Sequence, residues 1–406
     1  GAKMNVLFLT LVSIEDINEQ GIYHDLIKEF RNRNVNIFVV CPRERRMKVD
    51  TELFEDGRIK ILKVKTGNIT KTNVIEKGIT TVTIEKVFLN AVKKYFKKIK
   101  FDMIIYSTPP ITFYKIIKYF KLKDKAISYL MLKDIFPQNA VDIGLIKKTS
   151  FLYKYFRKKE EKLYDISDFI GCMSPRNCEY ILKHNHIDKE KIEVFSNSIK
   201  ISDFSAPPAY LDVHERYSIP KNKVLFLYGG NLGKPQGIDF LINVIDNFEK
   251  LEDIFLLIVG SGTEYRKIES HLSVSKICNT KLISFLPKRD YDSILKKADA
   301  GLIFLDKRFT IPNFPSRLTA YMDYALPIIA ATDKNTDIKE TLELSECGFW
   351  CESGDTGLFM KYVDILSRDK EKRVKMGKNG RKYLEKNYNI EKNIDILLKH
   401  LYKTEA

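Results

Sequence analysis

The sequence contains little that would support a disulfide-rich, metal-binding or membrane-spanning protein. Its six cysteines are scattered, and no two of them form a CxxC pair. Structural zinc sites and disulfide frameworks draw on cysteines at short, regular spacings, so neither is expected. No apolar run approaches the roughly 18 residues that a membrane span needs. No His, Asp and Glu residues stand at metal-ligand spacing, and no Asp-x-Asp is placed to hold a metal against a diphosphate. We therefore expect no metal, no cofactor and a cytoplasmic location.

Acidic residues are scarce in one stretch of the first half. Between Arg58 and Lys162 there are 25 basic and 8 acidic side chains, a net charge of +17 within a chain of net charge +16. Such an excess suits an anionic surface, although lysines on solvated faces would give the same count. In this stretch aromatic residues alternate with lysines at helical spacing in 92–100, 113–121 and 151–159. That pattern predicts helices lying on an anionic membrane leaflet, or an aromatic core stripe with a basic back. Nucleic acid is not expected as a partner.

Short apolar runs that end in polar or Gly/Pro turns occur throughout the chain and predict buried parallel strands. They lie at 4–11, 35–40, 60–64, 103–106, 126–132, 169–173, 192–195, 224–228, 255–259, 281–285, 301–304 and 328–330. Helical patterns separate them, the first at 22–33, and the segment Ser202–Tyr210 with Pro207-Pro208 resembles a linker. The fold class predicted is α/β, with two Rossmann-like domains facing each other across a cleft. We expect domains at 4–201 and 209–387, with residues 388–406 packing back on the first.

Two stretches in the second half have the chemistry of a diphosphate site. Tyr228–Gly237 contains Gly230, Asn231, Gly233 and Lys234 before a helix, and Pro315–Pro327 contains Ser316 and Arg317 where the next helix starts. Glycines let backbone N–H groups approach a phosphate, and a helix N-terminus and basic side chains attract its charge. The alternative for the first stretch is an ordinary strand-to-helix turn with an exposed lysine. For the second it is a Ser316 N-cap with Arg317 in solvent.

The order and spacing of further motifs resemble family 4 glycosyltransferases of the GT-B fold over nearly the whole chain. In the first half the resemblance rests on 107–110, 133–137, Glu160 with Asp168, 174–175 and Asn197. In the second half it rests on the two stretches above, on 259–262, on 286–287 and on 376–381. The Gly-Asn-Leu-Gly form of the first stretch resembles the branch that builds bacterial surface polysaccharides on a lipid carrier.

The resemblance implies a set of donor-site residues: Gly230, Asn231, Gly233, Lys234, Gly262, Leu286, Pro287, Arg308, Ser316, Arg317, Ala320 and Asp323. On the acceptor side it implies Asp134, which would assist at the reacting hydroxyl as a general base or merely cap a turn. Gly21, His24 and Thr108 are expected to lie nearby.

Ala320 stands where relatives usually have a glutamate that binds the ribose hydroxyls, and Pro312 replaces a second one. Three explanations remain open. Asp323, on the same helix face, takes over the contact; the chain binds its nucleotide without that contact; or the alanine was introduced.

The resemblance implies a retaining glycosyltransferase, of hexosyl or N-acetylhexosaminyl type, in capsule, O-antigen or lipopolysaccharide synthesis. Its expected partners are a nucleotide sugar, most simply a UDP-sugar, an undecaprenyl-diphosphate-linked saccharide and the inner face of the plasma membrane, where the protein would be peripheral. A nucleotide-sugar 2-epimerase on the same fold and a catalytically silent nucleotide-sugar-binding protein remain the alternatives.

Overall fold

The computed structural model describes residues 3–70, 74–205 and 210–403, with side chains described for all of these except 74–79. The chain divides into two compact units. Unit 1 comprises Gly1–Lys200 together with Asn389–Ala406, and unit 2 comprises Ile201–Tyr388. Pro207-Pro208 of the expected linker and the expected limits at 209 and 406 lie outside the described residues.

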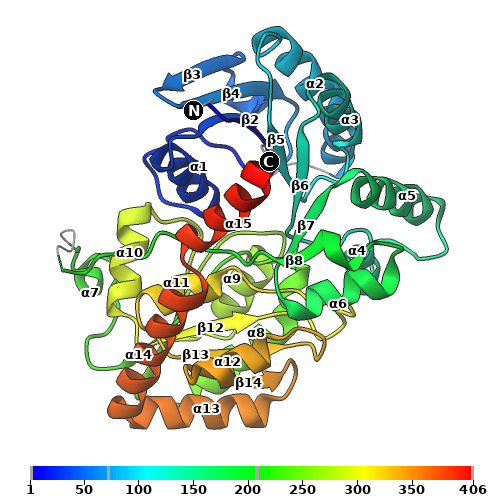
Figure 1. Ribbon diagram of the computed structural model, residues 1–406. Coiled ribbons are helices and arrows are strands. Elements are labelled where there is room, and N and C mark those ends of the chain that lie inside the picture. The colour runs from blue at the N-terminus through cyan, green and yellow to red at the C-terminus, as the bar shows by residue number, and fades with distance from the viewer. Residues whose placement is uncertain (1–2, 71–73, 206–209, 404–406) are drawn as a thin grey trace. The chain divides into compact units, whose positions relative to one another are not determined.

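Unit 1 is built on an eight-stranded sheet of order β3-β4-β2-β1-β5-β6-β7-β8, parallel except for β3, which runs antiparallel to β4 (Figure 1). Its strands are β1 (Asn5–Leu9), β2 (Asn36–Glu44), β3 (Glu52–Asp56), β4 (Ile59–Thr66), β5 (Met103–Ser107), β6 (Ile127–Leu132), β7 (Phe169–Cys172) and β8 (Ile192–Val194). Its helices are α1 (Ile22–Asn32), α2 (Val74–Tyr95), α3 (Tyr114–Asp124), α4 (Gln138–Asp142), α5 (Phe151–Ile166), α6 (Pro175–His184) and α15 (Ile390–Lys403), with short 3-10 turns at Arg45–Met47 and Lys189–Lys191.

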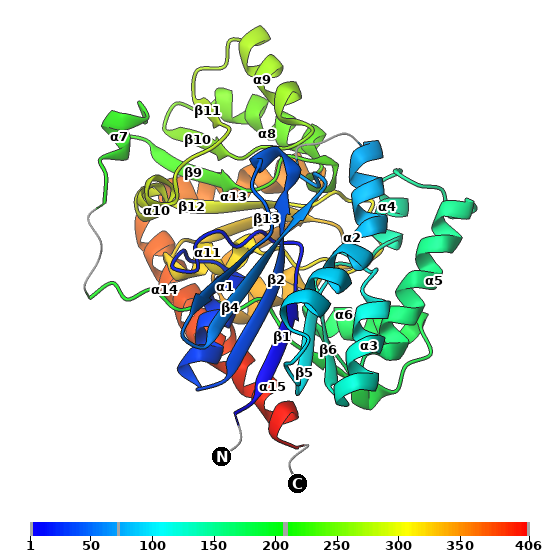
Figure 2. The same cartoon turned by 90° about the horizontal axis from the view of Figure 1, so that it is seen from above.

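The two faces of this sheet bury different helices because side chains alternate along each strand. Alternate residues of the strands, such as Val6 and Ile37, share one core with α1 and α15. Phe38 points to the other face and packs edge-to-face on Phe96 and Phe101, beside α2 and α3. Figure 2 shows α2 and α3 on one side of the sheet, and Figure 1 shows the red α15 beside the blue α1.

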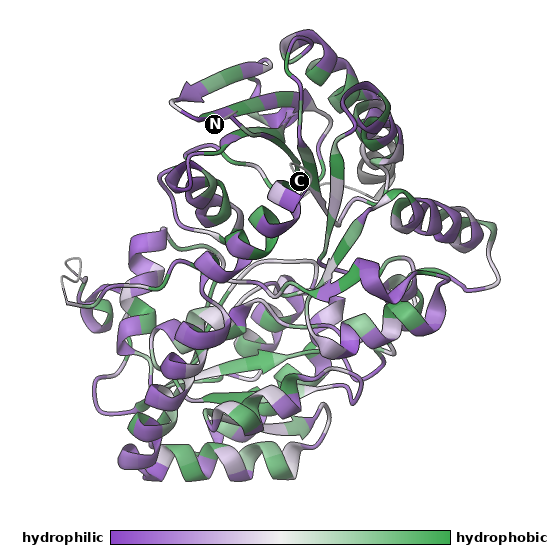
Figure 3. Ribbon diagram, viewed as in Figure 1, coloured by the Kyte–Doolittle hydropathy of each residue, from purple (hydrophilic) through white to green (hydrophobic). Residues whose placement is uncertain are grey.

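Unit 2 is built on a six-stranded parallel sheet of order β11-β10-β9-β12-β13-β14. Its strands are β9 (Val224–Gly229), β10 (Ile254–Val259), β11 (Thr280–Ile283), β12 (Ala300–Phe304), β13 (Ile328–Thr332) and β14 (Gly348–Glu352). Its helices are α7 (Val213–Arg216), α8 (Ile238–Glu249), α9 (Tyr265–Val274), α10 (Lys288–Lys297), α11 (Arg317–Asp323), α12 (Ile338–Ser345), α13 (Thr356–Arg368) and α14 (Lys370–Asn387), with a 3-10 turn at Lys234–Gln236. Helices α8, α9 and α13 share one core with the sheet. In Figure 3 the strands are coloured hydrophobic and α14 mainly hydrophilic.

The expectation of two Rossmann-like domains is confirmed, and the chain changes units at Lys200/Ile201 and again at Tyr388/Asn389. Two strands were missed. They are β3, which pairs with β4 through the Asp56-Gly57 turn, and β14 at the edge of the second sheet. None of the helices that the structure describes combines the length and the hydropathy that crossing a bilayer requires.

Candidate active site

In unit 2 the loop that follows β9 is held by the loop that follows β10. The Gly230 N–H donates to the Val259 carbonyl (3.0 Å), and the Leu232 N–H donates to the Ser261 carbonyl (2.9 Å). The Gly233 N–H donates to the Gln236 side chain (3.0 Å). These bonds fix a glycine-rich turn at the carboxyl end of the sheet, the edge at which parallel α/β folds bind ligands.

The glycines of the loop after β10 are required by the close approach of the two loops. A Cβ atom on Gly260 would lie 1.8 Å from the Gly230 carbonyl oxygen. Gly262 has φ +156°, and a Cβ there would lie 2.4 Å from the Leu232 carbonyl oxygen. Neither position has room for a side chain, so the backbone of the loop after β10 is bare at both.

Arg317 lies against this turn and so joins the two stretches that the sequence singled out. A Cβ on Gly230 would be 3.2 Å from Arg317 Nε, the nearest of its neighbours. Ser316 precedes α11 and makes no side-chain cap. Within the described residues neither Arg317 nor Lys234 is part of a salt bridge, and both are exposed. Each of the two stretches therefore contributes one cation without a carboxylate partner, Lys234 from the first and Arg317 from the second. Arg317 lies beside the backbone of Gly230.

Three tyrosines that the sequence did not indicate lie beneath the turn. The Gly229 N–H donates to the Tyr321 hydroxyl (3.1 Å), which donates to the Leu302 carbonyl (2.9 Å). The Tyr228 hydroxyl donates to the backbone carbonyl of Asn231 (2.6 Å). A Cβ on Gly229 would lie 1.9 Å from the Tyr291 hydroxyl, which has no partner among the described residues. Burial raises the pKa of Tyr291, and the nearby charge of Arg317 opposes that rise.

The remaining donor-side predictions lie at strand ends of the same sheet. Leu286 and Pro287 follow β11, with Pro287 as the N-cap of α10. Arg308 follows β12 and is paired in bidentate fashion with Asp306, at 3.0 Å through both Nε and Nη2. The Asn231 side chain, which is exposed, donates to Gln236 (3.2 Å). Of these residues Arg308 alone carries a charge, and that charge already has a partner.

The Asp323 carboxylate is held by hydrogen bonds to other residues of unit 2. Its carboxylate accepts from the Ser202 N–H (3.0 Å) and hydroxyl (2.6 Å), and from Arg381 Nη1 (3.1 Å). Arg381 also donates to the Ser202 carbonyl (2.7 Å). Asp323 is 4% exposed. These bonds make it an anchor for the start of unit 2, so we do not retain it as a substitute for the glutamate missing at Ala320, which is itself partly exposed in α11.

In unit 1 the carboxyl ends of β5 and β6 bring Thr108 and Asp134 together. The buried Thr108 hydroxyl oxygen accepts from the Lys133 N–H (2.9 Å) and the Asp134 N–H (3.4 Å). Asp134 Oδ1 is buried and has no partner among the described residues. Burial raises the pKa of Asp134 to about 6, while a hydrogen bond with Thr108 opposes the rise. Near neutral pH such a carboxylate is ionised, yet basic enough to accept a proton.

The first turn of α1 lies close to the same group. Burial raises the pKa of Tyr23 to about 12 against a hydrogen bond with Ser107, and the charge of Asp134 adds to the rise. The next residue, His24, has an Nε2 atom without a partner, and burial lowers its pKa. A Cβ on Gly21 would lie 2.8 Å from His24 Nδ1. The structure thus places Gly21 and His24 together, and adds Tyr23 as a neighbour of Asp134.

The three basic aromatic stretches of unit 1 differ in what they expose. In 92–100 and 113–121 the large apolar side chains are mostly buried, among them Phe96, Phe113 and Phe120. In those two stretches the large apolar side chains face the core and the lysines lie on the opposite side of the helix. In 151–159, on α5, Phe151 is 83% exposed and its neighbour Leu152 is 47% exposed. Only the third stretch therefore presents apolar side chains of the kind a membrane contact needs.

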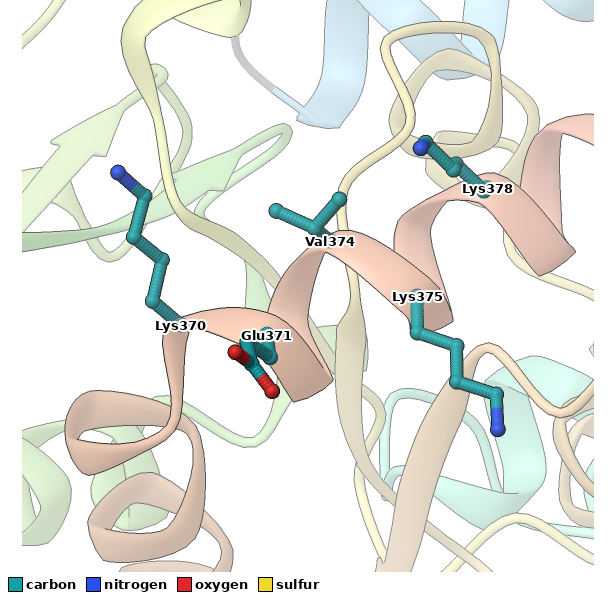
Figure 4. Close-up of a pocket in the computed structure, with 5 residues that line it drawn as sticks. All are labelled: Lys370, Glu371, Val374, Lys375 and Lys378. Carbon is teal, nitrogen blue, oxygen red and sulfur yellow. The ribbon is translucent and has the colours of Figure 1, made fainter.

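A hollow of about 390 Å³ lies against the first turns of α14 (Figure 4). Its lining is one side of that helix, namely Lys370, Glu371, Val374, Lys375 and Lys378. It shares no residue with either group described above, so we assign it no part in the site.

Residues 212–383, which include the glycine-rich turn, Arg317 and the sheet that carries them, match the family model described as Glycosyl transferases group 1. The chain carries a group 1 glycosyltransferase domain. The protein is accordingly a glycosyltransferase, as the motifs predicted.

Relatives of this glycosyltransferase cover different shares of its length. It is 23% identical over 303 residues to "Probable glycosyltransferase WbjE" of Pseudomonas aeruginosa, which covers 73% of each chain. It is 26% identical over 161 residues to WcaI of Escherichia coli, whose name refers to colanic acid biosynthesis, with 38% of each chain covered.

Solved structures resemble this glycosyltransferase over nearly its full length. Sucrose-phosphate synthase of Thermosynechococcus elongatus superposes with a TM-score of 0.77, 14% identity and 99% of each chain covered. HepE of Anabaena in complex with UDP-glucose superposes with a TM-score of 0.66 and 13% identity, over 98% of this chain and all of that one (100%). At these identities the likeness establishes the two-domain fold of the glycosyltransferase.

Proposed function

We propose that this glycosyltransferase transfers a sugar from a UDP-sugar to a lipid-linked saccharide during bacterial surface polysaccharide synthesis, with retention of anomeric configuration. The contact of Arg317 with Gly230 carries the donor half of the proposal, because it sets a free cation against the bare backbone of the glycine-rich turn. The name of WcaI and the UDP-glucose bound to HepE support the pathway and the donor.

The donor diphosphate would be held on unit 2. The Lys234 ammonium and the Arg317 guanidinium supply positive charge there, beside the glycine-rich turn. As the bond between the anomeric carbon and the diphosphate breaks, the nucleoside diphosphate leaves with the electron pair, and its growing charge is stabilised by these groups. In this proposal they do the work that a metal ion does in other transferases.

The acceptor hydroxyl would be activated on unit 1. As its oxygen bonds to the anomeric carbon, its proton passes to Asp134, whose buried Oδ1 has no hydrogen-bond partner among the described residues. The hydrogen bonds from the backbone of Lys133 and Asp134 to Thr108 fix the turn that carries this carboxylate. Retention rests on the family resemblance, and the anomeric signals of the product in an NMR spectrum would decide it.

A peripheral membrane location is part of the proposal. Around the start of α5, Leu145 is 58% exposed and Phe151 83% exposed, and lysines 147, 148, 154 and 158 belong to the same segment. Exposed apolar side chains among lysines favour an anionic lipid surface. Figure 1 shows α5 at the outer margin of unit 1.

Nucleotide release from purified protein tests the donor half. We expect UDP to be formed from one or more UDP-sugars when a saccharide acceptor is present. Arg317→Ala and Lys234→Ala should each weaken binding of UDP about tenfold or more, since each removes a charge-assisted contact with a phosphate. Arg368→Ala, an exposed arginine on α13 of the same unit, is the matched control and should bind UDP normally.

Unchanged UDP affinity in both variants would remove the two cations from the site. Conversion of the UDP-sugar without an acceptor would instead favour the 2-epimerase. Binding without any turnover would favour a silent nucleotide-sugar-binding protein.

A further inference from the structure

Lys133 is a cation of unit 1 that has no carboxylate partner. Its ammonium donates to the Asn197 side-chain oxygen (2.8 Å) and lies 5.5 Å from the centre of the Phe195 ring. Within the residues that the structure describes, no Asp or Glu forms a salt bridge with it. Burial alone lowers its pKa to about 7, and no neighbouring charge opposes this.

Other lysines of unit 1 that are withdrawn from water are treated differently. Lys63, 7% exposed, is paired with Glu15 (3.4 Å), and Lys121 is paired with Asp168 (2.7 Å). A desolvated ammonium without a counter-charge is unfavourable, so proteins rarely keep one unless it has a use. A strongly perturbed group of this kind is a candidate for a functional site.

The position of Lys133 fits a binding role. It follows β6 and reaches Asn197 beyond the end of β8, at the carboxyl edge of the sheet, and it directly precedes Asp134 in the chain. The Lys133 side chain is only partly exposed, which leaves it reachable by a ligand while most of its water shell is lost. Its backbone N–H is fixed by Thr108 (2.9 Å), so the ammonium is carried by a rigid turn.

We propose that Lys133 and Asn197 form a subsite for a phosphate group of the acceptor, next to the hydroxyl that Asp134 would activate. The proposal rests on the function proposed above for the identity of the acceptor, because a saccharide joined to its lipid through a diphosphate brings phosphate oxygens to this edge. The ammonium would supply the charge and the Asn197 amide a second donor.

Chemical labelling of lysines tests this subsite without any turnover. Purified protein is treated with a limiting amount of acetic anhydride at pH 7.5, and each lysine is quantified by mass spectrometry. Lys133 should react fast because much of it is unprotonated there. Inorganic pyrophosphate or a short isoprenyl diphosphate should slow its labelling several-fold, while Lys63 and Lys121 serve as internal controls and stay unchanged.

The proposed donor site would also bind diphosphates, so the labelling is repeated on the double variant Lys234→Ala, Arg317→Ala. Protection of Lys133 should persist there. Protection by both probes would mean that the subsite recognises the phosphate alone. Protection by the isoprenyl diphosphate only would mean that the subsite recognises the lipid chain together with the phosphate. No protection by either probe, or protection lost in the double variant, would overturn the subsite.

Kinetics provide the second test. Lys133→Met should raise KM for a phosphate-bearing acceptor about tenfold with little change in kcat, and should raise KM for the matching alkyl glycoside much less. Lys133→Arg should recover part of the loss. Equal KM in Lys133→Met and wild type would reject the subsite while transfer itself stood. Absence of transfer from every UDP-sugar would reject the proposed function, and the labelling result would still decide the subsite.

Discussion

Asp134 and Lys133 are adjacent residues on which burial acts in opposite directions. It raises the pKa of the carboxyl to about 6 and lowers the pKa of the ammonium to about 7. Each charged form is therefore disfavoured by folding. Groups that weaken the fold in the form present at neutral pH are typical of active sites, where binding or catalysis is the reason for keeping them.

Asp134→Asn should lower transfer strongly and yet stabilise the protein at neutral pH. The pKa of Asp134 is raised on folding from 3.8 to about 6, so the stability that its protonated form supplies is full below pH 4 and is lost as pH rises to about 6. A shift of about two pH units corresponds to at most about 3 kcal/mol. Urea unfolding at pH 4 and pH 7 should show the gain of the variant only at pH 7.

Asp165→Asn, an exposed carboxylate on α5, is the control and should alter neither transfer nor stability. Wild-type turnover in Asp134→Asn would mean that the carboxylate is only a cap. A stability gain that is equal at both pH values would mean that its pKa is not raised.

At the scale of elements, the glycine-rich turn after β9 owes its shape to the loop after β10. Hydrogen bonds join the two loops, and Gly260 lets them touch. The site in unit 2 is therefore two interlocked loops, and a change in one is expected to move the other.

Gly260→Ala should weaken UDP binding about tenfold or more and lower the melting temperature, because the new Cβ would fall 1.8 Å from the Gly230 carbonyl oxygen and displace it. Calorimetric titration with UDP measures the first effect and thermal unfolding the second. Gly357→Ala is the matched control, since its Cβ would meet only the Asp355 side chain at 4.0 Å within the first turn of α13. Normal UDP affinity in Gly260→Ala would show that the turn does not depend on this contact.

The sequence sufficed for the elements that have a local signature. Apolar runs predicted the buried parallel strands. The edge strand β3 was missed although the Asp56-Gly57 pair, with Gly57 at φ +58°, is a typical hairpin signal. The exposed, polar pattern of β3 hid it from a search for apolar runs.

Contacts between residues that are far apart in the chain could not be predicted from the sequence. Lys133 was part of a motif, but its partner Asn197 is 64 residues away, so its lack of a counter-charge appeared only in the structure. Asp323 shares a helix face with Ala320, which suggested a ribose contact. Its bonds to Ser202 and Arg381, 121 and 58 residues away, gave it a different role.

For the whole molecule, the charge excess of the first half coincides with exposed apolar side chains at the start of α5, as it also does at Leu122 of α3, which is 75% exposed. The protein should bind vesicles of anionic lipid and be released as salt rises, because surface charges are screened beyond about 10 Å at 0.1 M ionic strength. Phe151→Ser should weaken this binding, since it removes an 83% exposed aromatic ring. Co-sedimentation with vesicles measures both effects.

Leu344→Ser in unit 2 is the matched control, because Leu344 is 75% exposed but belongs to the nearly neutral half of the chain. Equal binding to neutral and anionic vesicles, or to neither, would contradict a membrane surface here.

Because residues 389–406 belong to unit 1, the order in which the chain is synthesised affects how unit 1 folds. Ile390, Ile394, Leu397 and Leu401 belong to the core of unit 1, yet they leave the ribosome only after all of unit 2. Unit 2 is one continuous segment and has its whole core available first. Because domains generally fold as units while the chain is made, the first unit to be translated is the last to be completed. Until then one face of the sheet in the nascent chain lacks the cover that α15 provides.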